Sequence, residues 1–139
     1  MIAIEGRLPG AFGHTRKELA AAARAFAQKS ARRIRTPFCD VAVILQDDAG
    51  SDAVHQGIMG IKGATDVITQ RYEPIAGEAP GVYGEIYVNV ERALALGGWK
   101  ELLLYVAHGF DHLSGADDLD EKGYRTMRRR ELRWIAALG

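Results

Sequence analysis

The chain has 139 residues, of which 18 are basic and 18 are acidic, so its formal net charge is zero. This length predicts one domain, spanning residues 1–139, with a core of modest size. Balanced charge neither favours nor excludes nucleic acid as a partner, so only local clusters of charge bear on that question. The single Cys39 excludes an internal disulfide and a cysteine-based zinc site. Because no signal-like or long apolar segment occurs, we expect a cytoplasmic protein that does not enter a membrane.

A short strand, a long helix and an inner strand are predicted in turn for the first third of the chain. Met1–Glu5 is a short apolar segment, typical of an edge strand. Thr15 and Glu18 have the spacing of a capping box, which predicts a helix from there to about Arg35. We interpret the basic residues late in this helix as a solvated face, with a phosphate-binding surface as the alternative; they are Arg24, Lys29, Arg32, Arg33 and Arg35. Phe38–Leu45 is almost entirely apolar, which indicates an inner strand.

Two strands separated by loops are predicted for the middle of the chain. Gln46–Asp52 is polar and predicts a turn, whereas Ala53–Gly60 is ambiguous and allows one or two helical turns. Val67–Tyr72 is a strand candidate. Residues 82–90 alternate strictly between apolar and polar or aromatic side chains, which predicts a strand with two different faces. The second face faces either solvent or a binding cleft; its residues are Tyr83, Glu85, Tyr87 and Asn89.

The last third of the chain predicts three helices. Glu91–Leu96 is a short helical segment, and Trp99–Leu113 is apolar nearly all round, as in a central buried helix. The last helix runs from about Leu119 to Leu138, and its expected inward-facing residues are Tyr124, Met127, Trp134, Ile135 and Leu138. Its other faces are basic and interpreted as solvated, with RNA contact as the alternative; they carry Arg125, Arg128, Arg129, Arg130 and Arg133. This order of elements indicates an α+β fold, with one mixed sheet of about four strands packed with helices.

Two histidines in the buried helix give the clearest chemical signal. His108 and His112 are four residues apart, so their imidazoles share one helix face and can clamp a divalent ion. Burying an imidazole costs on the order of a few kcal/mol unless its nitrogens are satisfied, which a shared metal achieves. Gly115 can end the helix, and Asp117 or Asp118 can then supply a third ligand after the turn. The alternative is a pair of core histidines that are satisfied without a metal.

Asp111 is a candidate general base beside these histidines. Zinc peptidases with this histidine spacing carry a glutamate directly after the first histidine, whereas Gly109 occupies that position here. Asp111 is the nearest carboxylate, and on a helix it lies about as far to one side of the histidines as residue 109 lies to the other. It could act as a base or hydrogen-bond a histidine nitrogen. A solvent-facing ion pair is the alternative.

The segment from His108 to Asp118, HGFDHLSGADD, resembles the HGxLHLxGYDH signature of the YbeY family of rRNA maturation factors, also described as metal-dependent endoribonucleases. Thr65–Thr69, followed by Tyr72-Glu73, resembles the TDVLSF segment of that family and the acidic residue after it. Gly84-Glu85-Ile86 resembles its Gly-Asp-Ile strand. The order and spacing of these segments agree over residues 38–138.

The resemblance implies a cytoplasmic α+β protein that acts on ribosomal RNA or a ribosomal subunit and binds one Zn²⁺, or another divalent transition metal, per chain. His108 and His112 match the first two family ligands, and Asp118 falls where the family has its third histidine. An aspartate is a competent zinc ligand, and a harder ligand set tolerates manganese, iron or nickel better. The spacing from Asp118 to Glu121 also fits a helix N-cap, which is the alternative to ligation.

Two departures from the family pattern bear on activity. Ile58-Met59-Gly60 aligns with a Tyr-Arg-Gly segment, so Met59 replaces an arginine implicated in RNA cleavage, and Lys62 or Arg71 are candidates to supply the missing cation. Asp111 replaces a leucine. The prediction is a metal-dependent, endoribonuclease-like hydrolase in rRNA maturation. The alternatives are a ribosome-associated metalloprotein with little catalysis and a zinc hydrolase with a non-RNA substrate.

Overall fold

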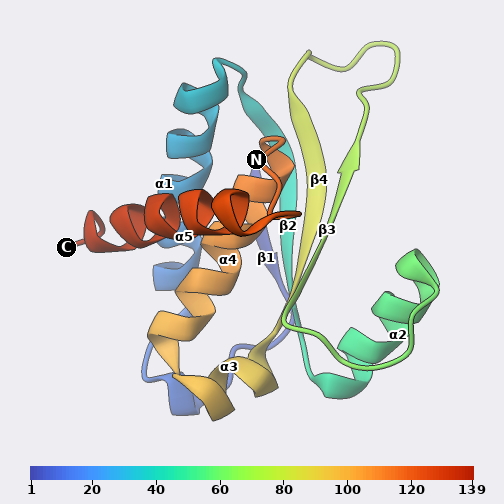
Figure 1. Ribbon diagram of the computed structural model, residues 1–139. Helices are drawn as coiled ribbons and strands as arrows, with labels where there is room; N and C mark the ends of the chain where they lie inside the picture. The colour runs from blue at the N-terminus through green and yellow to red at the C-terminus, as the bar shows by residue number, and fades with distance from the viewer.

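The computed structural model describes residues 1–139 and contains one four-stranded sheet with helices packed on one face (Figure 1). The elements in chain order are β1 (Ile2–Glu5), the 3-10 helix η1 (Gly10–Phe12), α1 (Arg16–Ile34), β2 (Phe38–Gln46), α2 (Asp48–Met59), β3 (Val67–Tyr72), β4 (Val82–Asn89), α3 (Val90–Leu96), α4 (Trp99–Leu113) and α5 (Glu121–Ala136). No helix combines the length and the apolar character that a membrane span requires. The predicted α+β class with a mixed sheet is confirmed.

The sheet has the strand order β1-β2-β4-β3. β1, β2 and β4 are parallel, and β3 pairs with β4 in the antiparallel direction. β1 is therefore an edge strand and β2 an inner strand, as predicted. Val43 on β2 pairs with Ile86 on β4, and both are fully buried on the face that the helices cover.

The second face of β4 does not contribute to a cleft under the helices. Tyr83, Glu85 and Tyr87 alternate with the buried residues of β4, so they lie on the face of the sheet away from α1 and α4, and they are half-buried. Asn89 differs, because it is buried and its side-chain oxygen accepts a hydrogen bond from the Arg92 N–H at 3.1 Å. Asn89 is thus the N-cap of α3. The predicted strand accordingly ends one residue before its expected end.

α2 begins earlier than the polar composition of its first residues predicts. The Asp47 carboxylate accepts a hydrogen bond from the Gly50 N–H at 2.8 Å and caps the helix, which starts at Asp48. Most of the turn predicted for Gln46–Asp52 is therefore helical. An aspartate that is typical of a turn is equally typical of an N-cap, and composition alone does not distinguish the two.

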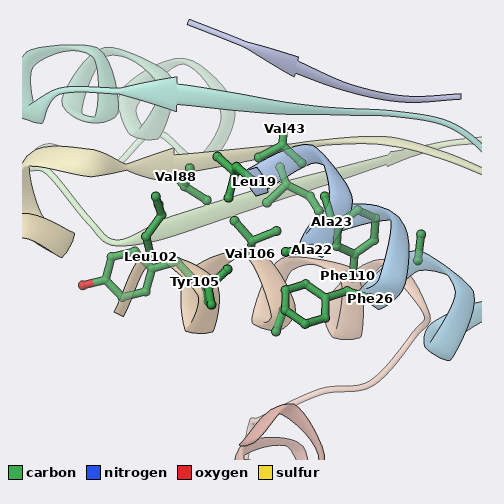
Figure 2. Packing of buried hydrophobic residues seen from close by; sticks show 14 of the residues in the cluster. Leu19, Ala22, Ala23, Phe26, Val43, Val88, Leu102, Tyr105, Val106 and Phe110 are labelled. Carbon is green, nitrogen blue, oxygen red and sulfur yellow. The ribbon is translucent and has the colours of Figure 1, made fainter. Parts of the chain in front are cut away.

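α4 is the central helix of the core, and α5 crosses it on the side away from the sheet (Figures 1 and 2). Leu102, Val106 and Phe110 recur every four residues along α4 and are fully buried. Leu19 and Phe26 on α1 pack against the same cluster, so α1 and α4 form one layer over the sheet. The prediction of a central, buried helix at residues 99–113 is confirmed.

α5 is shorter and packs differently from its prediction. Met127 and Trp134 are buried as expected. Tyr124 and Leu138 do not pack inward, because 45% and 39% of their surfaces are exposed. Ile135 is partly buried and, like Trp134, packs on the core near the C-terminal end of α5, whereas Tyr124 in the first turn and Leu138 beyond the helix remain largely outside.

Gly109 lets α4 approach β4 closely. A Cβ atom built at this position would lie 2.3 Å from Cγ2 of Ile86, which is fully buried, so the side chain or the helix would have to shift. Any larger residue here, including the glutamate that zinc peptidases carry, would push the helix away from the sheet. The absence of that base therefore follows from packing.

We expect Gly109→Ala to lower the free energy of unfolding by about 1–3 kcal/mol, because the steric cost exceeds the helix-propensity gain of roughly 0.5–1 kcal/mol. Urea denaturation measures the change. Gly57→Ala is the matched control, because Gly57 is also helical but has open space around its Cβ position. This control should be neutral or stabilised, and equal changes in the two variants would contradict the steric account.

Candidate metal centre

His108, His112 and Asp118 converge at one point near the end of α4. The Nε2 atoms of His108 and His112 lie 3.4 Å and 3.6 Å from Oδ2 of Asp118. One potential ligand atom from each residue lies within 4.8 Å of the other two. The two imidazole rings are nearly perpendicular, at 82°, with centroids 4.5 Å apart. Three half-buried donors at this separation can share one metal ion.

A left-handed turn after α4 brings the third residue back to the two histidines. Gly115 has a φ of 96°, which favours glycine, and it reverses the chain just after the helix ends. Asp120 caps α5 by accepting a hydrogen bond from the Gly123 N–H at 2.6 Å. The alternative role of Asp118 as an N-cap is therefore wrong, and its carboxylate remains directed at the histidines.

The outer nitrogens of both imidazoles are already engaged. Nδ1 of His112 lies 3.1 Å from the Ala116 carbonyl oxygen, and Nδ1 of His108 lies 2.8 Å from Oε2 of Glu131. Both partners are acceptors, so each imidazole donates from Nδ1 and keeps the Nε2 lone pair for a ligand. This is the arrangement that metal-ligating histidines usually have.

Glu131 is a buried carboxylate that sequence analysis did not identify. It comes from α5, is fully buried and leaves Oε1 without a hydrogen bond; the nearest cation is Arg128, whose Nε lies 3.9 Å away. Burial lowers the pKa of His108, but the hydrogen bond and charge of Glu131, together with the charge of Asp118, raise that pKa overall. The one signal in the sequence was a single acidic residue in the middle of a basic helix.

A cavity of about 400 Å³ opens beside the three converging residues. Its lining residues are Met59, Asp66, Val67, Ile68, Thr69, Leu104, Tyr105, His108, His112, Asp118, Tyr124 and Arg128. The Thr65–Thr69 segment and Met59, both singled out in the sequence, thus meet the histidine motif in space. Lys62 and Arg71 do not line the cavity, and Arg71 instead donates to the Leu113 carbonyl oxygen at 3.0 Å.

The structure does not bring Asp111 to this cavity. Its carboxylate is fully buried and faces Arg130, whose Nε lies 3.0 Å from Oδ1 and 3.2 Å from Oδ2. Arg33 on α1 approaches the same carboxylate at 3.5 Å and also donates to the Ser114 hydroxyl. Burial raises the pKa of Asp111 to about 6, although Arg130 acts in the opposite direction. In this position Asp111 serves neither as a base at the cavity nor as a partner for a histidine nitrogen. Arg33 and Arg130, which are expected from the sequence to lie on solvated faces, instead contact this buried carboxylate.

Comparisons with known proteins agree with the motif. The profile of the family described as Endoribonuclease YbeY matches residues 12–139. A relative of that name from Rhodopirellula baltica is 34% identical over 112 residues, covering 73% of this chain but only 56% of the relative. Another, from Desulfitobacterium hafniense, is 28% identical over 113 residues and covers 72% of each chain. A Thermotoga maritima protein of known solution structure matches 97% of this chain and 87% of its own, with a TM-score of 0.60 and 28% identity.

Proposed function

The chain belongs to the family of endoribonuclease YbeY, and from this membership we propose that it is a metal-dependent endoribonuclease that acts in rRNA maturation. Its proposed place of action is the cytoplasm, on ribosomal RNA or a ribosomal subunit. The observation that carries the proposal is the convergence of His108, His112 and Asp118 beside a cavity whose lining includes the other family segments.

In this proposal the three converging residues hold one divalent ion, with Zn²⁺ the best match to two imidazoles and a carboxylate. When bound, such an ion supplies a Lewis acid that activates water and neutralises charge on a phosphodiester. His108 and His112 bind through Nε2, and Glu131 and the Ala116 carbonyl fix the orientation of their rings. Apolar residues such as Leu104 form part of the cavity lining beside these ligands.

The experiment that tests the function uses the Zn²⁺-reconstituted protein with two substrates, a structured fragment of ribosomal RNA and casein. We expect the RNA to be cut and the casein to remain intact. His108→Ala should lose both bound zinc and RNA cleavage. Cleavage of casein instead of RNA would favour a zinc hydrolase of another substrate class. Retention of zinc without cleavage of either would favour a ribosome-associated metalloprotein.

Glu131→Gln should weaken Zn²⁺ binding by about 10–100-fold, because it removes the negative charge that orients and polarises His108. Competition with a chromophoric chelator measures the affinity. Glu121→Gln is the control, because Glu121 lies on the same helix but its carboxylate pairs with Arg125 at the surface. Equal zinc affinities in the two variants would show that Glu131 has no part in metal binding.

A further inference from the structure

Arg128 is the one arginine or lysine among the residues that line the cavity. Asp66 and Asp118 contribute carboxylates, whereas Arg128 contributes the guanidinium. Met59 occupies the position where the resemblance predicts an arginine, and it is 56% exposed on the cavity lining. A thioether donates no hydrogen bond and carries no charge. Recognition of an anionic ligand by a cationic side chain in this cavity therefore falls to Arg128.

The guanidinium of Arg128 is held in place without using its donors fully. Its Cζ lies 5.4 Å from the centroid of the Tyr124 ring, one helical turn earlier on α5, in a cation–π arrangement. The distance from its Nε to Oε1 of Glu131 is 3.9 Å, which is too long for a hydrogen bond, and this buried Nε has no other partner. The side chain is 34% exposed, so a ligand in the cavity can reach it. The guanidinium of Arg128 thus has a defined orientation, but its N–H donors are not all used in hydrogen bonds.

The chemistry of this arrangement fits a phosphodiester. The planar fork of an arginine matches two oxygens of a phosphate, and the contact is a charge-assisted hydrogen bond. Asp66 and Asp118 would repel a phosphate that approached without a cation. Arg128 lines the same cavity, and together with an ion bound by the histidines it would offset this repulsion.

We propose that Arg128 binds a non-bridging phosphate oxygen of the RNA substrate and so supplies the cation that Met59 does not. This inference rests on the proposed function, because it assigns a residue for the substrate of that same site. It places the phosphate-binding cation on α5 rather than on α2, the helix that carries Met59.

The test measures binding and cleavage of a fluorescein-labelled ten-nucleotide RNA by the Zn²⁺-loaded protein at several salt concentrations. Arg128→Gln should weaken binding on the order of tenfold, the loss expected for one charge-assisted hydrogen bond, and should reduce the salt dependence by about one phosphate contact. Arg129→Gln is the control, because Arg129 is the exposed next residue on the same helix and its loss changes the net charge equally. That control should change binding by less than about threefold.

Arg128→Lys should retain most of the salt dependence while losing affinity, because it keeps the charge but not the fork. Bound zinc should be unchanged in all three variants. Equal binding by Arg128→Gln and Arg129→Gln, loss of zinc from Arg128→Gln, or no binding by the unsubstituted protein would overturn the inference. If Arg128-dependent binding occurs without cleavage, the inference stands and the proposed function fails. If Arg128→Gln binds and cuts normally, the function stands and the inference fails.

Discussion

Replacing Asp111 by alanine is expected to lower the free energy of unfolding by about 3 kcal/mol or more, the usual cost of breaking one side of a buried ion pair. The carboxylate is fully buried and receives contacts from Arg130 on α5 and Arg33 on α1. Its removal leaves Arg130, whose side chain is only 15% exposed, without its counter-charge. The position therefore joins three helices, and urea denaturation of the zinc-free protein measures its contribution.

The double variant Asp111→Leu/Arg130→Met tests whether the stability lost on removing Asp111 comes from leaving Arg130 without its partner. Leucine stands at this position in the family signature that the motif resembles, and methionine fills a similar volume to the arginine stem. Because apolar replacement of both partners of a buried ion pair is often neutral or stabilising, we expect the double variant to regain most of the lost stability. A double variant as unstable as the sum of its single variants would show that the carboxylate matters independently of Arg130.

The local elements of this fold follow from patterns within single segments. The apolar run of α4 and the alternation of β4 are each contained in one stretch of chain, so their type and approximate ends are predictable. The starts of α2 and α5 are less predictable, because Asp47 and Asp120 are helix caps in the structure but are equally typical of turns. Capping depends on which backbone N–H the side chain meets, and that is a property of the folded geometry.

The candidate site likewise combines residues that local sequence patterns bring together with residues that only the folded arrangement of the helices brings together. His108 and His112 are brought together by helical spacing alone, and Asp118 by a turn of a few residues. Glu131 and Arg128 reach the site only because α5 crosses α4, at sequence separations of 20 residues or more from His108. The same crossing places Arg130 on Asp111 rather than in solvent. Long-range pairing of charges therefore escapes prediction from a single sequence, even where both partners are noted in it, as Asp111 and Arg130 are.

Asp118→Ala should weaken zinc binding by at least about 100-fold, because the loss of a ligand exceeds the roughly 10–100-fold cost of losing a ligand's hydrogen-bond partner. The thermal stability gained from zinc should fall with it, since an ion at 100 times its dissociation constant stabilises a protein by about 2.7 kcal/mol. Metal analysis and thermal unfolding at a fixed zinc concentration measure the two effects together. Asp118 lies beside both histidines, so this substitution tests the assignment of the third ligand directly.

Asp117→Ala is the matched control, because this neighbouring carboxylate is exposed and its one hydrogen bond, from the Leu119 N–H, is long at 3.4 Å. It should retain zinc and its stabilising effect. With zinc removed by a chelator, both variants should unfold within about 0.5 kcal/mol of the unsubstituted protein, because Asp117 is exposed and the half-buried Asp118 keeps 32% of its side chain in contact with solvent. Asp118→Ala that is equally destabilised with and without zinc would assign Asp118 a structural role. Zinc loss from Asp117→Ala alone would place the third ligand one residue earlier in the turn.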